Sequence, residues 1–304
     1  MNDKPNISGI TFYGKKMLIA QISDMHVVNE GELCNEFIPT NDMLINTIGR
    51  INEIKPKVDI IIATGDLTQN GTKSEYKNLK KILSNIDIPV YLIPGNHDNP
   101  NNLKDVFQNH NYLPTKGSLS YVIKEFPITI IGIDTTIESS PSGEISEKLL
   151  NWLENELEKS RDKPVIIFMH HPPFKTGIWW MDAIGLKGKK KFELTLKKFN
   201  NIEAVLCGHI HRQVQRRWAG TIGYIAPSTA HQLELDLEGN CLLGCTYDPP
   251  AFSIHKWDQS HSLISHICYV KKSEPFVPPE YQNKTAIKKA YNYFKKQYQI
   301  IESE

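Results

Sequence analysis

Residues 17–26 read Met-Leu-Ile-Ala-Gln-Ile-Ser-Asp-Met-His, an apolar run that ends in an acid and a histidine two positions apart. The run Met17–Ile22 has the length and composition of a buried strand. Four further apolar runs, at 58–63, 90–93, 165–169 and 204–207, are predicted as strands in the same way. Each is followed by residues that can bind a metal ion: Gly65-Asp66, Gly95-Asn96-His97-Asp98, His170-His171-Pro172-Pro173 and Gly208-His209-Ile210-His211.

The placement of these clusters directly after strands predicts that they meet. The carboxyl ends of parallel strands form one edge of a sheet, and sites form in the crevice outside that edge. Carboxylate, amide and imidazole groups all bind divalent metals. In an extended chain Asp24 and His26 project to the same side, as do His209 and His211, so one strand end supplies two ligands. Any one cluster could be turn chemistry, but five together indicate a metal site.

The rest of the pattern predicts the fold class. Helices are expected at 40–54, 72–83, 145–157 and 192–199, between the strands of the first two-thirds of the chain. The last third, 213–270, is typical of short antiparallel strands with turns. We therefore expect an α+β (α/β) catalytic domain over residues 1–270. A proline-containing linker and an amphipathic helix at 285–301 would form the remainder, 271–304.

Composition limits the partners. The 304 residues include 35 basic and 34 acidic side chains, for a formal net charge of +1. Such a balance argues against a bulk electrostatic grip on nucleic acid or on an anionic membrane. No apolar run approaches the ~18 residues of a membrane span, and the first 14 residues lack a signal sequence, so a cytoplasmic protein is expected. Cys241 and Cys245 resemble half a zinc site, but no second pair matches them.

The ordered set of five clusters resembles the calcineurin-like metallophosphoesterase superfamily over roughly Leu18 to Ile264. This resemblance implies a four-layer α-β-β-α sandwich, with two mixed sheets flanked by helices. It also implies a hydrolase of phosphate esters that uses two metal ions, with iron, manganese and zinc all open.

The resemblance assigns roles residue by residue. His97 would be catalytic, facing the substrate phosphate and helping the leaving oxygen depart, and Asp98 would orient it by a hydrogen bond. His171 would support a neighbouring ligand rather than bind metal. The implied ligands are Asp24, His26 and His211 for the first metal, Asn96, His170 and His209 for the second, and Asp66 as the bridge.

Three longer stretches, Gly65–Tyr76, His170–Asp182 and Pro227–Phe252, resemble class III cyclic nucleotide phosphodiesterases and the related glycerophosphodiesterases. In that branch a histidine at the position of His231 can line the substrate pocket, together with Asn96 and His97. The apolar run Trp179-Trp180-Met181, expected in a loop, could either pack on the core or wall the pocket.

The resulting hypothesis is a phosphodiesterase for small diesters, with 3′,5′-cyclic nucleotides such as cyclic AMP first, acting by a metal-bridging hydroxide. Two divalent ions carry four positive charges, and two carboxylates and one hydroxide carry three negative charges. The remaining single positive charge suits the monoanion of a phosphodiester. Glycerophosphodiesterase, phosphomonoesterase and nucleotide pyrophosphatase activities stay open on the same metal core. A scaffold without turnover and a nuclease fit less well, because all ligands are present and the charge is balanced. The oligomeric state is left open.

Overall fold

A computed structural model describes residues 16–239, 243–259, 262–274, 276, 278–279 and 283–301. The chain divides into two compact units between Lys271 and Lys272. The predictions made for the first 14 residues and for Cys241 lie outside the described residues.

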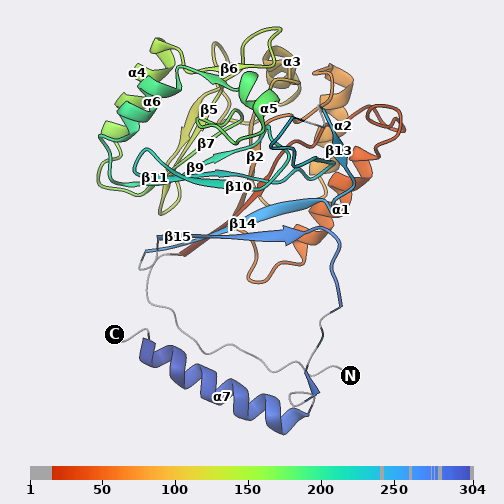
Figure 1. Cartoon of the computed structure of the whole chain (residues 1–304), viewed down its shortest axis with the longest axis vertical. Helices are drawn as coiled ribbons and strands as arrows, with labels where there is room; N and C mark the ends of the chain where they lie inside the picture. The colour runs from red at the N-terminus through yellow and green to blue at the C-terminus, as the bar shows by residue number, and fades with distance from the viewer. Residues whose placement is uncertain are drawn as a thin grey trace. The chain divides into compact units, whose positions relative to one another are not determined.

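The larger unit alternates strands and helices and ends in a run of strands (Figure 1). Its strands are β1 (Lys16–Ile22), β2 (Ile60–Thr64), β3 (Val90–Ile93), β4 (Tyr121–Ile123), β5 (Thr129–Ile133), β6 (Gly143–Glu144), β7 (Val165–Met169), β8 (Leu186–Lys187), β9 (Ile202–Cys207), β10 (Val214–Trp218), β11 (Thr221–Ile225), β12 (Gln232–Leu233), β13 (Cys245–Thr246), β14 (Ala251–Asp258) and β15 (Ser262–Tyr269). Its helices are α1 (Thr40–Asn52), α2 (Lys73–Leu83), α3 (Pro100–Val106), α4 (Glu147–Glu158), α5 (Trp179–Ala183) and α6 (Lys189–Leu196).

Two mixed sheets form the centre of this unit. The first has the order β15-β14-β1-β2-β3, with β1, β2 and β3 parallel and β14 antiparallel to β1. The second has the order β10-β11-β9-β7-β5-β4, with β11, β9, β7 and β5 parallel. All five residues of β2, β5 and β7 are buried, as expected of strands covered on both faces. The sheets contact each other through β2 with β7 and β3 with β5, which confirms the expected α/β class.

Helices cover the outer faces of the sheets. In Figure 1, α1 and α2 lie toward one side of the unit, and α4 and α6 lie together toward the other. The capping box expected before α2 is present: Thr72 Oγ1 accepts from the amide of Glu75, and the Glu75 carboxylate accepts from the amide of Thr72. This reciprocal pair fixes the start of α2 at Lys73, directly after Thr72.

Three expectations were wrong in detail. The run at 179–181 is not a loop, because Trp179–Ala183 forms the short helix α5 with Met181 buried. The last third is not simply antiparallel, since β11 pairs with β9 in parallel. Within the described part of 232–246, only β12 and β13 form strands, and each has two residues.

The second unit contains the helix α7 (Lys284–Ile301), one residue longer at its start than the expected helix. No helix in the described part of the chain is long and apolar enough to cross a membrane.

Candidate dinuclear metal centre

The five clusters of the sequence lie at the carboxyl ends of five strands drawn from both sheets. Asp24 and His26 follow β1, Asp66 follows β2, and the Asn96–Asp98 cluster follows β3 in the first sheet. The remaining two clusters follow β7 and β9 in the second sheet. The structure therefore brings together all seven residues expected to bind metal.

The potential ligands form two groups. Within each group, one side-chain nitrogen or oxygen per residue lies within 4.8 Å of the others, and every member is buried. One group consists of Asp24, His26, Asp66 and His211, and the other of His170, His171 and His209.

Asp66 lies between the two groups. Its Oδ2 is 3.7 Å from Nε2 of His26 and 3.4 Å from Nε2 of His170. A single carboxylate oxygen thus faces a nitrogen of each group. A carboxylate that bridges two metal ions must lie between their ligand groups, and the ions it holds are roughly 3.5–4 Å apart. Asp66 has this position.

Asn96 lies beside the second group, and His171 is held by other protein groups. Its Oδ1 lies 3.0 Å from Nε2 of His170. Both ring nitrogens of His171 have protein partners, with the Thr135 hydroxyl at 2.8 Å from Nδ1 and the Pro141 carbonyl at 3.2 Å from Nε2. Each ring nitrogen of His171 therefore already has a partner within the protein.

Backbone carbonyls and one amide fix which ring nitrogen faces the centre. Nδ1 of His170 donates to the Thr64 carbonyl at 2.8 Å, and Nδ1 of His211 donates to the His231 carbonyl at 3.0 Å. Nδ1 of His26 donates to Oε1 of Gln69 at 2.8 Å. In each case the lone pair that remains is on Nε2, the atom that points at the other ligands. Such outer partners orient metal-binding histidines and raise their basicity.

The backbone at the ligands is left-handed, not extended. The φ angles are 51° at Asp24, 45° at His26, 47° at Asp66, 73° at His209 and 51° at His211. The expectation of an extended strand end is therefore wrong, although Asp24 and His26 still reach the same group. His209 and His211 instead diverge, one to each group. Left-handed non-glycine residues concentrate at functional sites, where the surrounding structure holds them in place.

Two of the glycines beside these ligands are required by close approach. A Cβ on Gly208 would lie 2.0 Å from Oγ of Ser23 and 2.9 Å from Oδ2 of Asp24. A Cβ on Gly95 would lie 2.2 Å from Oδ1 of Asp66. Both glycines therefore allow the loops of different strands to pack directly against ligand carboxylates.

Burial and mutual charge shift the pKa values of the group in opposite directions. Burial raises the pKa of Asp24 to about 7 and lowers those of His26 and His209 to about 3. Burial alone would also lower the pKa of His170, but the carboxylates of Asp66 and Asp24 raise it to about 9. Burial alone would raise the pKa of Asp66. The positive charge of His170 and its hydrogen bond overcome that effect and hold the pKa of Asp66 well below its usual range. The buried carboxylates thus attract positive charge, which a metal cation would supply.

The donor set fits two metal ions. Nε2 of His209 is buried and has no hydrogen-bond partner, although a buried polar atom is normally paired. It belongs to the same tight group as His170. A metal ion at this point would satisfy the orphaned nitrogen and balance the carboxylates. Mixed nitrogen and oxygen ligands of this kind accept iron, manganese or zinc.

His97 lies at the mouth of the centre but is oriented differently from our expectation. Its amide donates to Oδ1 of Asp66 at 2.9 Å, and its Nδ1 donates to the carbonyl of Gln69 at 2.9 Å. Asp98 does not hold the ring; its oxygens accept from the amides of Leu67 and Gly95 and from the Tyr76 hydroxyl, at 2.8–2.9 Å. Asp98 therefore fixes the loops that carry Asp66 and His97.

A cavity of about 320 Å³ opens over the centre. His97 and His231 both line it, as does Trp180. The ring centroid of His231 lies 4.6 Å from that of His211, and its Nδ1 is buried without a partner. Gln69 and Asn35 also line this cavity and were not predicted. The only sequence signal for Gln69 as a cavity residue is its proximity to Asp66. Asn35 has no motif around it.

Proteins of known sequence resemble most of this chain. A probable glycerophosphodiester phosphodiesterase GpdQ from Arcobacter nitrofigilis is 40% identical over 259 residues, which is 85% of this chain and 95% of that protein. The 3′,5′-cyclic adenosine monophosphate phosphodiesterase CpdA of Escherichia coli K12 is 27% identical over 219 residues, 72% of this chain and 78% of that protein.

Solved structures share the fold. A dimetal phosphatase from Danio rerio superposes with a TM-score of 0.58 at 13% identity, over 82% of this chain and 98% of that one. The purple acid phosphatase PPD1 from yellow lupin gives a TM-score of 0.65 at 14% identity, over 86% of this chain and 53% of that one. The family model described as calcineurin-like phosphoesterase matches residues 17–213, a span that includes every residue of both ligand groups. The chain belongs to the calcineurin-like phosphoesterases and is a hydrolase of phosphate esters.

Proposed function

We propose that the protein hydrolyses small phosphodiesters at this centre, with glycerophosphodiesters as the first substrate class. The observation that carries the proposal is the position of Asp66 between the two ligand groups, with His97 beside it at the mouth of the cavity. The choice of a glycerophosphodiester follows the name of the relative that is 40% identical. It replaces the cyclic nucleotide as first candidate.

The metal ligands and His97 would have separate roles in the reaction. Two metal ions held by Asp24, Asp66 and the histidines would supply hydroxide near neutral pH and polarise the phosphoryl oxygens. His97 binds no metal in this arrangement. Because its Nδ1 donates to the Gln69 carbonyl, a protonated Nε2 is the atom that can donate to the leaving oxygen.

The test is a comparison of substrates on protein reconstituted with manganese. We expect kcat/KM for glycerophosphoethanolamine to exceed that for 4-nitrophenyl phosphate, a monoester. Asp66→Asn, purified and loaded in the same way, should lose both activities and so excludes a contaminating enzyme. A strong preference for the monoester in the wild-type protein would overturn the proposal.

Cyclic nucleotides form the second candidate class, because one wall of the cavity is apolar. Trp180, Met181 and Ile184 from the α5 region line it together with Leu233 and Leu243, and a flat nucleobase suits such a wall. Relatives named as cyclic nucleotide phosphodiesterases support the same class. Hydrolysis of 3′,5′-cyclic AMP that is faster than that of glycerophosphoethanolamine would favour this second class.

A further inference from the structure

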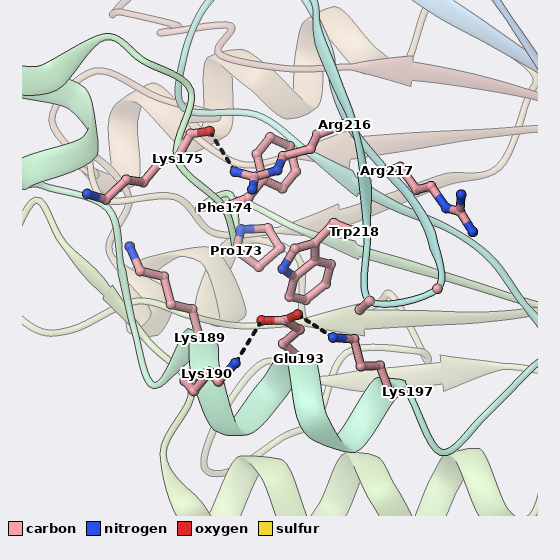
Figure 2. A pocket seen from close by; sticks show the side chains of 12 residues that line it. Pro173, Phe174, Lys175, Lys189, Lys190, Glu193, Lys197, Arg216, Arg217 and Trp218 are labelled. Atoms are coloured by element: carbon pink, nitrogen blue, oxygen red, sulfur yellow. Dashed lines mark hydrogen bonds and ion pairs between the residues drawn. The ribbon is translucent and has the colours of Figure 1, made fainter.

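A second and larger cavity lies away from the metal centre. It has a volume of about 700 Å³, is open to solvent, and is lined by the segment that follows His171, by α6, and by β10 with the turn after it (Figure 2). It shares no lining residue with the cavity over the metal centre. Any ligand in it would therefore not contact the metal ligands.

The lining of this second cavity is strongly basic. It carries six cationic side chains and one carboxylate, in a chain whose formal net charge is only +1. The carboxylate of Glu193 pairs with Lys197 at 2.7 Å and with Lys190 at 3.7 Å. The other four cations are Lys175, Lys189, Arg216 and Arg217, and the described part of the chain provides no ion pair for any of them.

Three of these four cations come from different elements and surround one side of the hollow. Lys175 lies on the loop after β7, Lys189 at the start of α6 and Arg216 on β10. In Figure 2 the ammonium groups of Lys175 and Lys189 lie to one side of the Arg216 guanidinium, with the Lys175 side chain extending away from Arg216, and Arg217 points away on the opposite side. Arg216 is steadied by a hydrogen bond to the carbonyl of Lys175 at 3.4 Å. Like charges that line one hollow without counter-ions repel each other, so an anion in the hollow would relieve that repulsion.

The floor of the hollow is aromatic and firmly packed. Phe174 and Trp218 are 6% and 7% exposed. The Trp218 ring lies 5.4 Å from that of Phe192. The Phe174 ring fills the space beside Gly223, where a Cβ would come within 2.2 Å of it. The small exposed parts of Phe174 and Trp218 give the lining an apolar component, which distinguishes the hollow from a row of solvated lysines.

We propose that this basic cavity binds a small polyanion with a flat apolar part, of the nucleoside polyphosphate class. Its volume is within the range of sites for small molecules. The planar guanidinium of Arg216 matches two phosphate oxygens, and Lys175 and Lys189 supply point charges around them. The confinement of the charge to one hollow, in a chain of balanced overall charge, distinguishes this site from a surface that tracks a polynucleotide.

The test measures calorimetric binding of the β,γ-imido analogue of ATP to the manganese-loaded protein. Saturable binding is expected, and Arg216→Ala should weaken it by about tenfold or more, equivalent to about 1.4 kcal/mol. Lys189→Ala should weaken it in the same direction. Lys77→Ala is the control, because this exposed lysine on α2 lines neither cavity, and it should change the affinity by less than about threefold. Thermal unfolding of each variant checks that it is folded.

His97→Ala locates the bound nucleotide, because that residue lies at the other cavity. It should leave the affinity unchanged. Loss of binding in His97→Ala but not in Arg216→Ala would overturn the proposal, as would equal losses in Arg216→Ala and Lys77→Ala. Absence of saturable binding, or displacement of the analogue by a single-stranded oligonucleotide at lower concentration than by ATP, would overturn it as well.

Discussion

At the scale of single residues, Asn96 is the ligand whose removal separates the two metal positions. Its amide oxygen lies beside His170 in one group only, whereas Asp66 faces both. We expect Asn96→Ala to retain about one metal ion where the wild-type protein retains two, because the other group keeps all its ligands. Elemental analysis after dialysis measures this directly. Asp66→Asn is the comparison, and it should lose both ions; an Asn96→Ala protein that still holds two ions would contradict the assignment.

His97 is expected to affect turnover without affecting metal content. It lines the cavity and donates its amide, not its ring, to Asp66. We predict that His97→Ala lowers kcat by about 10²–10⁴-fold, the range for a general acid or base. The loss should be smaller for substrates with a good leaving group, such as bis(4-nitrophenyl) phosphate. An equal loss for good and poor leaving groups would contradict a role in protonating the leaving oxygen.

The residues of the centre could be read from the sequence, but their conformation could not. Metal-binding residue types after five strands are a local pattern, and the structure brings all seven together. The left-handed backbone at Asp24 or His209 depends on the loops of other strands that press against it, as at Gly208 and Gly95. The orientation of His97 by Gln69 likewise depends on a contact that no sequence pattern encodes.

At the scale of elements, a buried polar chain joins the two sheets beneath the centre. Nε2 of His255 on β14 donates to Oε1 of Gln21 on β1 at 2.9 Å, and Ser265 on β15 lies 2.7 Å from Nδ1. The amide of Gln21 continues to the carbonyl of Cys207 on β9 at 2.9 Å. These bonds satisfy polar groups that the packing of two apolar sheets would otherwise leave unpaired.

His255 makes stability depend on pH. Burial, with a smaller effect of His266, lowers its pKa from 6.5 to about 3. Between these values the unfolded chain binds a proton that the folded protein does not, so the free energy of unfolding falls as the pH falls below 6.5. The contribution is complete above pH 6.5, and about 3 kcal/mol of it should be lost by pH 4.5. Urea unfolding of metal-free protein across this range measures the slope.

Replacing the ring tests this dependence. His255→Gln should reduce the slope by about one proton between pH 6.5 and 4.5. His266→Gln changes an exposed histidine on the neighbouring strand β15 and should leave the slope nearly unchanged. If the slope of His255→Gln equals that of the wild-type protein, the titration belongs to other groups.

Elements formed by local signals were predicted well, and those formed by long-range pairing were not. The Thr72 capping box and the strand β3 follow from a few adjacent residues, and both appear where expected. The return of β14 to lie beside β1 pairs residues more than 230 positions apart along the chain, such as Gln21 with Ser253. Local periodicity carries no information about such a partner.

At the scale of the whole molecule, the ligands connect the two sheets. Asp24, His26, Asp66 and Asn96 come from the first sheet, and the three other histidines come from the second. An ion that binds only the folded protein raises the free energy of unfolding by about 2.7 kcal/mol at a hundred times its Kd. We therefore expect chelation of the metals to lower Tm by about 5–10 °C. Scanning calorimetry with and without EDTA measures the shift, and the Tm of Asp66→Asn should not respond to the chelator.

The division of the ligands between sheets also bears on the order of folding. Within the described residues, His211 is the only member of its group from the second sheet, and the proposed ligand Asn96, beside His170, brings the first sheet to the other group. Neither group is therefore complete on one sheet alone. We therefore expect metal ions to bind with full affinity only after the two sheets have docked. Bound metal ions should slow unfolding and leave the refolding rate nearly unchanged. The lifetime of the folded protein would then depend on how much metal is available after folding.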